Sequence, residues 1–156
     1  MIDAELAAFI EGPVMIVFGA ADAAGRPVIG RATGARCADS GQIDLLVSRA
    51  RWGAVTDDLR VGAQVAVTFS RPADYRTFQI KGVVTALTPP GPSDIAVATR
   101  YIQAVTGSLL DLGVLQTQVN HWLSSDDLIT LRLRPGAVFA QTPGPGAGAQ
   151  LSAALS

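Results

Sequence analysis

Residues 74–84, DYRTFQIKGVV, constrain the fold most strongly because two kinds of side chain alternate along them. The apolar members share one face of a predicted strand: Phe78, Ile80 and Val84. The polar members share the other face: Tyr75, Thr77, Gln79 and Lys81. Gly82 interrupts the apolar face and predicts a bulge or bend. The pattern is typical of a barrel strand whose outer face lines a site or a subunit contact.

Further strand patterns flank this stretch, and local turn signals join them. The predicted strands span residues 14–21, 28–36, 43–48, 65–70, 74–84 and 127–134. Asp, Gly and Pro residues separate the early strands, and Pro135 ends the last one. The chain is therefore predicted to be mainly β, a barrel of about six antiparallel strands with flanking helices.

The helices are predicted from apolar residues that recur at intervals of three and four. Asp3 caps the first helix, which ends at Gly12. The second spans residues 52–59, the third ends at Gly107, and the fourth contains Trp122. We expect the first helix to plug or cover the barrel and the last two to lie against its wall.

The composition excludes several classes of protein. A hydrophobic content of 49% with 16% charged residues excludes a disordered chain, and a net charge of -1 offers no general surface for nucleic acid. No apolar run is long enough to span a bilayer, so we expect a cytoplasmic protein without a membrane partner. The single Cys37 and single His make a disulfide or structural metal site unexpected. We expect one domain over residues 1–140 and a flexible tail rich in Pro, Gly and Ala over residues 141–156.

The order of these elements resembles the pyridoxamine 5′-phosphate oxidase-like family, the FMN-binding split barrels. The likeness covers residues 4–138 and rests on the early apolar strand with its turn at residues 22–27, on Arg31, on LLVSRARW at a strand-to-helix junction and on FQIKGVV. The resemblance implies a homodimer with FMN at the subunit interface. It also implies a flavoprotein that passes electrons or hydride between a reduced donor and a small substrate.

Matching this family residue by residue implies a set of cofactor-binding side chains. Arg31, Arg36 and Ser48 fall at positions that hold the cofactor phosphate, and Gln79 falls near the flavin ring. The residues alone indicate a phosphate site at the same junction, because Arg forks and a hydroxyl at a helix N-terminus suit an anion. The full set is Arg31, Arg36, Ser48, Arg49, Arg51, Trp52, Gln79 and Lys81. No catalytic residue is predicted.

The arginines of this set also have structural interpretations. Arg49 and Arg51 are consistent with a solvated loop edge as well as with a phosphate site. Arg31 and Arg36 point to opposite faces of a regular strand, so both reach one phosphate only if a bulge intervenes. At least one of them is then expected to be structural.

The other candidates have alternatives of the same kind. Trp52 is either a core residue of its helix or a ring that stacks on the cofactor. Gln79 and Lys81 either line the site or form the outward face of an edge strand. His121, the single imidazole, is either an ordinary residue or a haem ligand.

The chain departs from true pyridoxamine 5′-phosphate oxidases at two places. Those enzymes end in a segment with Arg and His that holds the substrate, whereas no basic residue follows Arg134 here. Gly53 and Ala54 stand where many family members place a Lys. We therefore expect an FMN-binding oxidoreductase that acts on another small molecule. The alternatives are a split barrel that binds F420 or haem, and a cofactor-free dimer with a binding or regulatory role.

Overall fold

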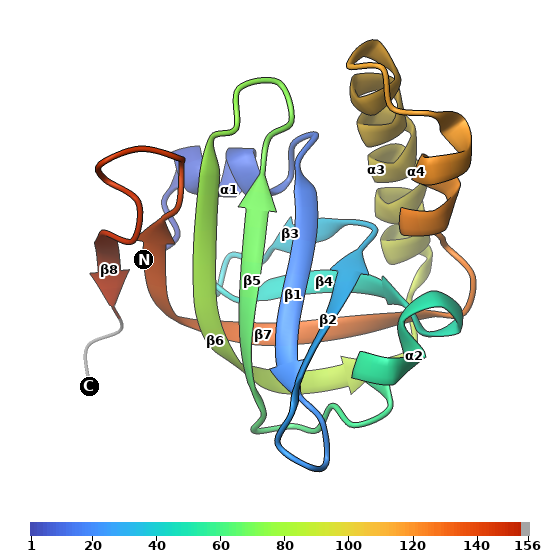
Figure 1. Ribbon diagram of the computed structural model, residues 1–156. Coiled ribbons are helices and arrows are strands. Elements are labelled where there is room, and N and C mark those ends of the chain that lie inside the picture. The colour runs from blue at the N-terminus through green and yellow to red at the C-terminus, as the bar shows by residue number, and fades with distance from the viewer. Residues whose placement is uncertain (154–156) are drawn as a thin grey trace.

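The computed structural model describes residues 1–153 and shows one curled antiparallel sheet with helices around it (Figure 1). The helices are α1 (Ala4–Ile10), α2 (Arg49–Thr56), α3 (Pro92–Asp111) and α4 (Gln116–Trp122). The strands are β1 (Met15–Ala21), β2 (Pro27–Ala32), β3 (Ala35–Cys37), β4 (Ile43–Ser48), β5 (Gln64–Ser70), β6 (Thr77–Thr88), β7 (Leu128–Ala140) and β8 (Gln150–Ala153). Their order in the sheet is β2-β1-β5-β6-β7-β4-β3, with β8 added to β7. The mainly β barrel that the sequence predicts is confirmed.

The sheet curls into a barrel because β2 and β3, at its two ends, are consecutive in the chain. Thr33 and Gly34 separate β2 from β3, and both form backbone hydrogen bonds with Leu46 of β4. Thr33 N–H donates to the Leu46 oxygen at 2.7 Å, and Leu46 N–H donates to the Gly34 oxygen at 3.0 Å. Gly34 has a φ of 151°, and a Cβ there would lie 3.2 Å from Val97 Cγ1 of α3. The prediction of one continuous strand over residues 28–36 is therefore wrong, because this break carries the chain from one end of the sheet to the other.

The core fills the inside of the curled sheet. Phe18 of β1 and Phe69 of β5 are fully buried. Buried and more exposed residues alternate along both strands, so one face of each strand points into the core and the other points outward. Asp3 caps helix α1, because its carboxylate accepts a hydrogen bond from Leu6 N–H in the first turn. The helix adds the buried Phe9 and Ile10 to the same core. The prediction that this helix plugs or covers the barrel agrees with this packing.

Strands β6 and β7 form the longest pairing of the sheet. The register shifts between Lys81 and Gly82, as the sequence predicts. Pro135 lies opposite Gly82, so the prediction that Pro135 ends the last strand is wrong. A bulge is a place where a strand tolerates proline, and β7 continues beyond it. Strand β6 begins at Thr77, later than predicted, because Tyr75 with a φ of 60° belongs to the hairpin turn.

Helices α3 and α4 lie side by side on one flank of the barrel, and α2 lies below them in Figure 1. The hydroxyl of Tyr101 joins α3 to the barrel by donating to the Val14 carbonyl oxygen at 2.7 Å. Helix α3 runs past Gly107, where we predicted its end, because the buried Val105 and Leu109 pack on both sides of the glycine. Among residues 1–153, no helix combines the length and the apolar character that crossing a membrane requires.

The segment that we predicted to be a tail from residue 141 onward includes β8. This strand pairs antiparallel with β7, with Ala153 opposite Ala137. The described part of the segment therefore extends the sheet beyond the predicted domain boundary.

Candidate functional site

Ser48 ends β4 and caps α2, which begins earlier than the predicted residue 52. The Ser48 hydroxyl accepts from Arg51 N–H at 3.2 Å and donates to the Asp126 carbonyl oxygen at 2.6 Å. Arg49 is bound to the same loop, since its N–H donates to the Asp127 carbonyl oxygen at 2.9 Å and its guanidinium pairs with the Asp127 carboxylate at 2.8 Å. The loop before β7 thus engages the polar groups of both residues.

Trp52 follows one residue after Arg51 and distorts α2, with φ of -118° and ψ of 30°. Its half-buried ring packs against the core, as does the buried Val55 one turn later. The interpretation of Trp52 as a core residue therefore agrees with the structure. Its indole Nε1 is nevertheless buried without a hydrogen-bond partner among the described residues. An unpaired buried donor costs free energy. A hydrogen bond from this Nε1 to an acceptor atom would therefore be favourable.

Arg31 lies half-buried on the outer side of β2, with its guanidinium carbon 4.8 Å from the centre of the Trp122 ring. No carboxylate within residues 1–153 lies at ion-pair distance from it. Burial lowers the pKa of Arg31, and the neighbouring Tyr101 opposes this shift. The guanidinium stays charged at any ordinary pH, so it is a partly desolvated cation without a counter-ion.

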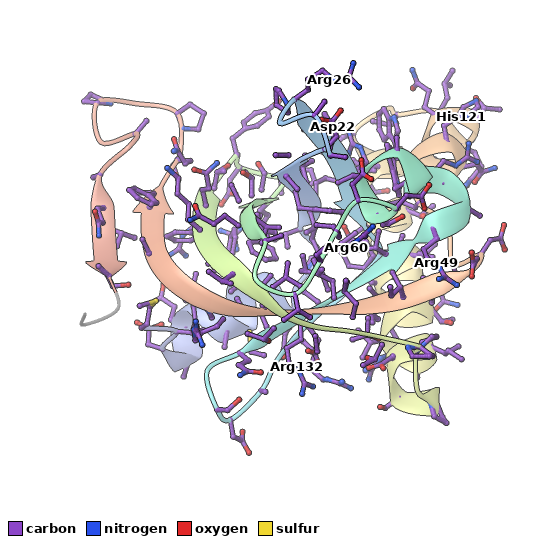
Figure 2. All side chains as sticks on the ribbon, turned by 90° about the horizontal axis from the view of Figure 1, so that it is seen from below. Asp22, Arg26, Arg49, Arg60, His121 and Arg132 are labelled. Atoms are coloured by element: carbon purple, nitrogen blue, oxygen red, sulfur yellow. The ribbon has the colours of Figure 1, made fainter. Side chains whose placement is uncertain are left out.

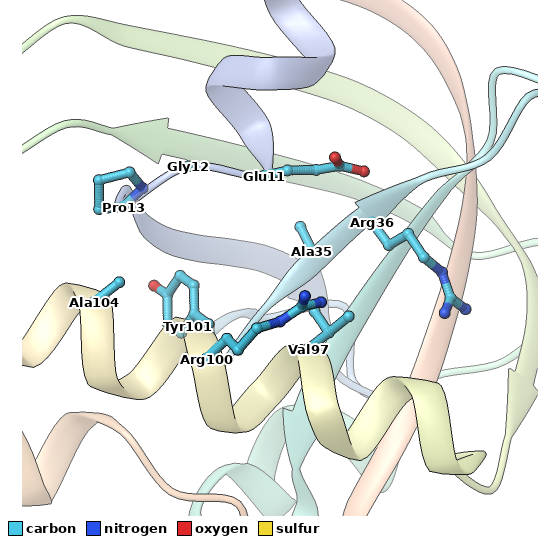
Figure 3. Close-up of a pocket in the computed structure, with 9 residues that line it drawn as sticks. All are labelled: Glu11, Gly12, Pro13, Ala35, Arg36, Val97, Arg100, Tyr101 and Ala104. Carbon is cyan, nitrogen blue, oxygen red and sulfur yellow. The ribbon is translucent and has the colours of Figure 1, made fainter.

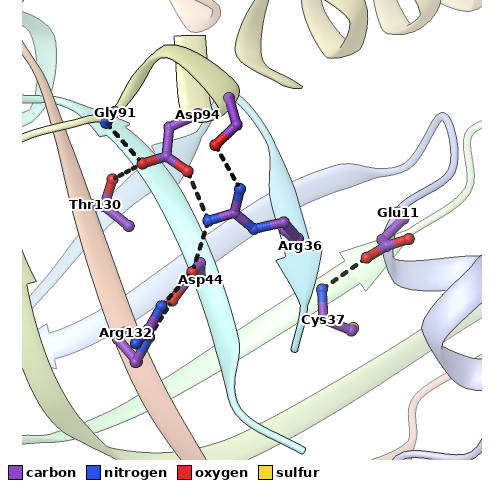
Figure 4. A network of polar contacts seen from close by, with 9 residues as sticks. Glu11, Arg36, Cys37, Asp44, Gly91, Asp94, Thr130 and Arg132 are labelled. Carbon is purple, nitrogen blue, oxygen red and sulfur yellow. Dashed lines mark hydrogen bonds and ion pairs between the residues drawn. The ribbon is translucent and has the colours of Figure 1, made fainter. Parts of the chain in front are cut away.

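Arg36, in contrast, lies in the middle of β3 and is held in a polar network (Figure 4). Its guanidinium pairs with the Asp44 carboxylate at 3.0 Å and with the Asp94 carboxylate at 2.7 Å. Asp44 also accepts two hydrogen bonds from Arg132, and Asp94 accepts one from Thr130. Arg36 therefore ties the start of α3 to β4 and β7, and its charge is neutralised within the chain.

Gln79 and Lys81 lie on the outer face of β6, which Figure 1 shows toward the viewer with no described helix in front of it. Gln79 Nε2 donates to Thr68 Oγ1 at 3.3 Å, and Lys81 Nζ lies 4.9 Å from the centre of the Phe139 ring. A shallow groove of about 600 Å³ runs across this face beside Lys81. Small residues of five strands line most of it, among them Gly19, Ala66, Gly82, Gly136 and Ala137.

His121 and Arg49 lie on the same side of the molecule, both at its periphery (Figure 2). His121 is exposed in the last turn of α4, next to the Trp122 ring that covers Arg31. Arg51 is exposed, and its side chain has no ion-pair partner among residues 1–153. The described residues contain no cluster of three or more His, Cys, Asp or Glu that could bind a metal ion.

The structure thus divides the predicted residues among three places. The first place is the flank that carries α4, where Arg31 lies together with Ser48, Arg49, Arg51 and Trp52 at the start of α2. The second is the network at the start of α3, which contains Arg36. The third is the outer sheet face, which carries Gln79 and Lys81. Among these groups, Arg31 fits a phosphate best. Ser48 and Arg49 are already engaged by the loop before β7, and Arg51 is exposed, whereas the unpaired Arg31 is half-buried. No residue pattern pointed to the partner of Arg31, since Trp122 is far away in the chain.

The sequence of this chain matches no protein-family model and no curated protein. Its fold matches solved structures. An F420 reductase superposes with a TM-score of 0.55 at 17% identity, covering 84% of this chain and 93% of that protein. HupZ of Group A Streptococcus gives 0.56 at 14% identity, covering 96% and 99%. A candidate pyridoxamine 5′-phosphate oxidase of Lactobacillus delbrueckii gives 0.54 at 13% identity, covering 88% and 93%.

This chain has the split-barrel fold. Its structural neighbours are split barrels of the pyridoxamine 5′-phosphate oxidase-like type, so the resemblance inferred from the sequence is confirmed for the fold. At these low identities the likeness concerns architecture alone, and the cofactor has to be inferred from the residues of this chain. Split barrels that differ this much in sequence place different side chains on the same strands.

Proposed function

We propose that two copies of this split barrel form a dimer that binds FMN and passes electrons or hydride from a reduced donor to a small substrate. The observation that carries the proposal is the half-buried, unpaired guanidinium of Arg31 against Trp122. A partly desolvated cation favours an anionic ligand, and the fork of an arginine suits a phosphate. The fold likeness to an F420 reductase supports F420 as the alternative cofactor.

The residues of this chain would bind and orient the cofactor. Arg31 would hold the phosphate, and the unpaired Nε1 of Trp52 would donate to an acceptor atom of the ligand. The bound flavin supplies the redox chemistry, so no acid–base pair or nucleophile is required of the protein. Gln79 keeps its side-chain oxygen available on the outer face of β6, where it would accept a hydrogen bond from a cofactor or substrate edge.

The outer sheet face supports the proposal of a dimer. It exposes small, flat and apolar surface, including Ile29 with 69% of its area exposed, beside the single Lys81. A second copy on this face would remove Ile29 from water and would exclude water from the groove. Gln79 and Lys81 of each subunit would then lie at the contact with the other.

The test is the retention of cofactor by the purified chain after incubation with FMN, with F420 or with haem. We expect retained flavin absorbance and quenched fluorescence with FMN. Arg31→Gln should weaken binding by about 1.5–3 kcal/mol, the contribution of a charge-assisted hydrogen bond. Arg134→Gln is the matched control, because Arg134 is exposed on β7 and lacks an ion-pair partner within residues 1–153.

Other outcomes would select a different function. Retention of F420 alone would support the alternative cofactor, and a haem spectrum that His121→Ala abolishes would support a haem protein. A dimer that retains none of the three would support a binding or regulatory role. A monomer by light scattering at micromolar concentration, without a retained cofactor, would refute the proposal.

A further inference from the structure

A second cleft lies on another part of the molecule, between α3 and the loop that follows α1 (Figure 3). Its volume is about 530 Å³. The side chains that give it chemical character are Glu11, Pro13, Val97, Arg100, Tyr101 and Ala104. Arg31, Trp52 and Lys81 are not among the lining residues, so this cleft is distinct from the proposed cofactor site.

One face of α3 forms a wall of the cleft. Val97, Arg100, Tyr101 and Ala104 recur at intervals of three and four, which brings them to the same side of the helix. Tyr101 is 7% exposed, and its hydroxyl donates to the Val14 carbonyl oxygen at 2.7 Å, which holds this wall in place. The floor beside it is the small Ala35 of β3. Val97, Ala104 and Ala35 therefore give the cleft a preformed apolar part.

Three charged side chains border this surface, and only two of them have charge to offer a ligand. Arg36 is neutralised by Asp44 and Asp94. Arg100 has no ion-pair partner within residues 1–153, and Figure 3 shows its guanidinium beside Val97 at the cleft. Glu11 uses one carboxylate oxygen, Oε1, to accept from Cys37 N–H at 2.7 Å, which leaves Oε2 available.

We propose that this cleft binds a small zwitterion with an apolar body, such as a free amino acid with an aliphatic side chain. The ligand carboxylate would pair with Arg100, and its ammonium group would donate to Glu11 Oε2. The apolar body would lie on Val97 and Ala104. A phosphate dianion fits less well, because the Glu11 carboxylate that lines the same cleft would repel it.

The experiment measures binding of leucine, leucinamide and N-acetyl-leucine by isothermal titration calorimetry. Leucinamide lacks the carboxylate and N-acetyl-leucine lacks the ammonium group, so each should bind about tenfold more weakly than leucine. Arg100→Gln should remove the difference between leucine and leucinamide. Glu11→Gln should remove the difference between leucine and N-acetyl-leucine, and its amide oxygen can still accept from Cys37 N–H. Arg134→Gln should leave all three affinities unchanged.

Absence of saturable binding by all three compounds would overturn the proposal. So would an Arg100→Gln variant that keeps its native circular dichroism spectrum and still prefers leucine over leucinamide. Arg100→Gln should also retain the cofactor as the unmodified chain does, because Arg100 lies outside the proposed cofactor site. Failure of this site is therefore distinguishable from failure of the proposed flavin function.

Discussion

Asp44 allows a quantitative test of how α3 is attached to the barrel. Its side chain is 2% exposed and accepts hydrogen bonds from Arg132 Nε at 2.7 Å, Arg132 Nη2 at 2.9 Å and Arg36 Nη2 at 3.0 Å. Arg36 in turn reaches Asp94 in the first turn of α3. Asp44→Asn keeps the volume of the side chain but removes its charge and turns an N–H₂ group toward a guanidinium.

The expected loss follows from the burial of the partners. Breaking a fully buried ion pair costs about 3–5 kcal/mol. Here the side chains of Arg36 and Arg132 are 36% and 44% exposed, so water can solvate them once the carboxylate is gone. We therefore expect a loss of about 2–3 kcal/mol in the free energy of unfolding, since part of the interaction is screened. At about 2–4 °C per kcal/mol for a chain of this size, Tm falls by roughly 4–12 °C.

Urea unfolding followed by circular dichroism at several pH values would measure this loss. Burial alone would raise the pKa of Asp44, but the hydrogen bonds from Arg132 and Arg36 outweigh it and hold the pKa below its usual value. The unfolded carboxyl titrates near pH 4, at about 3.9, so the stabilisation is fully present above that pH. It disappears as the pH falls through the lower pKa of the folded state. The gap between the unmodified chain and Asp44→Asn should therefore narrow in acid.

Asp127→Asn is the matched control because the Arg49–Asp127 pair is exposed, with 49% and 54% of the two side chains accessible. Its loss should stay below about 1 kcal/mol. Equal losses for Asp44→Asn and Asp127→Asn at neutral pH would show that the buried network at Asp44 stabilises the fold no more than an exposed ion pair does. A gap for Asp44→Asn that stays constant from pH 7 down to pH 3 would refute the assigned pKa direction.

Three further perturbations test local features of the fold. Gly82→Ala would place a Cβ 2.5 Å from the carbonyl oxygen of Arg134 and should cost about 1–3 kcal/mol in urea unfolding, whereas Gly136→Ala, with its nearest contact at 3.5 Å, should cost less; the reverse order would contradict the bulge geometry. Burial raises the pKa of the Cys37 thiol to about 12, so iodoacetamide should alkylate it far more slowly at pH 8 than in the urea-unfolded chain, and equal rates would contradict this. Tyr101→Phe removes the hydrogen bond to the start of β1 and should lower the free energy of unfolding by about 1–2 kcal/mol; an unchanged urea midpoint would show that the bond contributes nothing.

Local chemistry was sufficient to predict most of the elements of this fold. The alternation in β6, the bulge at Gly82 and the Asp3 cap each depend on a few neighbouring residues. The errors occur where distant contacts decide. Gly107 stays helical because buried neighbours hold the next turn, and Pro135 stays in a strand because it meets a bulge of another strand.

The candidate site was harder to predict from the sequence than the fold. A side chain can bind a ligand only if no partner within the chain already neutralises it, and the sequence does not show these partners. From the sequence, Ser48 is predicted at the end of a strand, and Arg31 and Arg36 are predicted on a single strand over residues 28–36. The folded structure shows what the sequence does not: Arg36 is neutralised by Asp44, while Arg31 lies unpaired against Trp122. The physical reason is that strand periodicity is a property of adjacent residues, whereas burial and ion pairing depend on segments that only folding brings together.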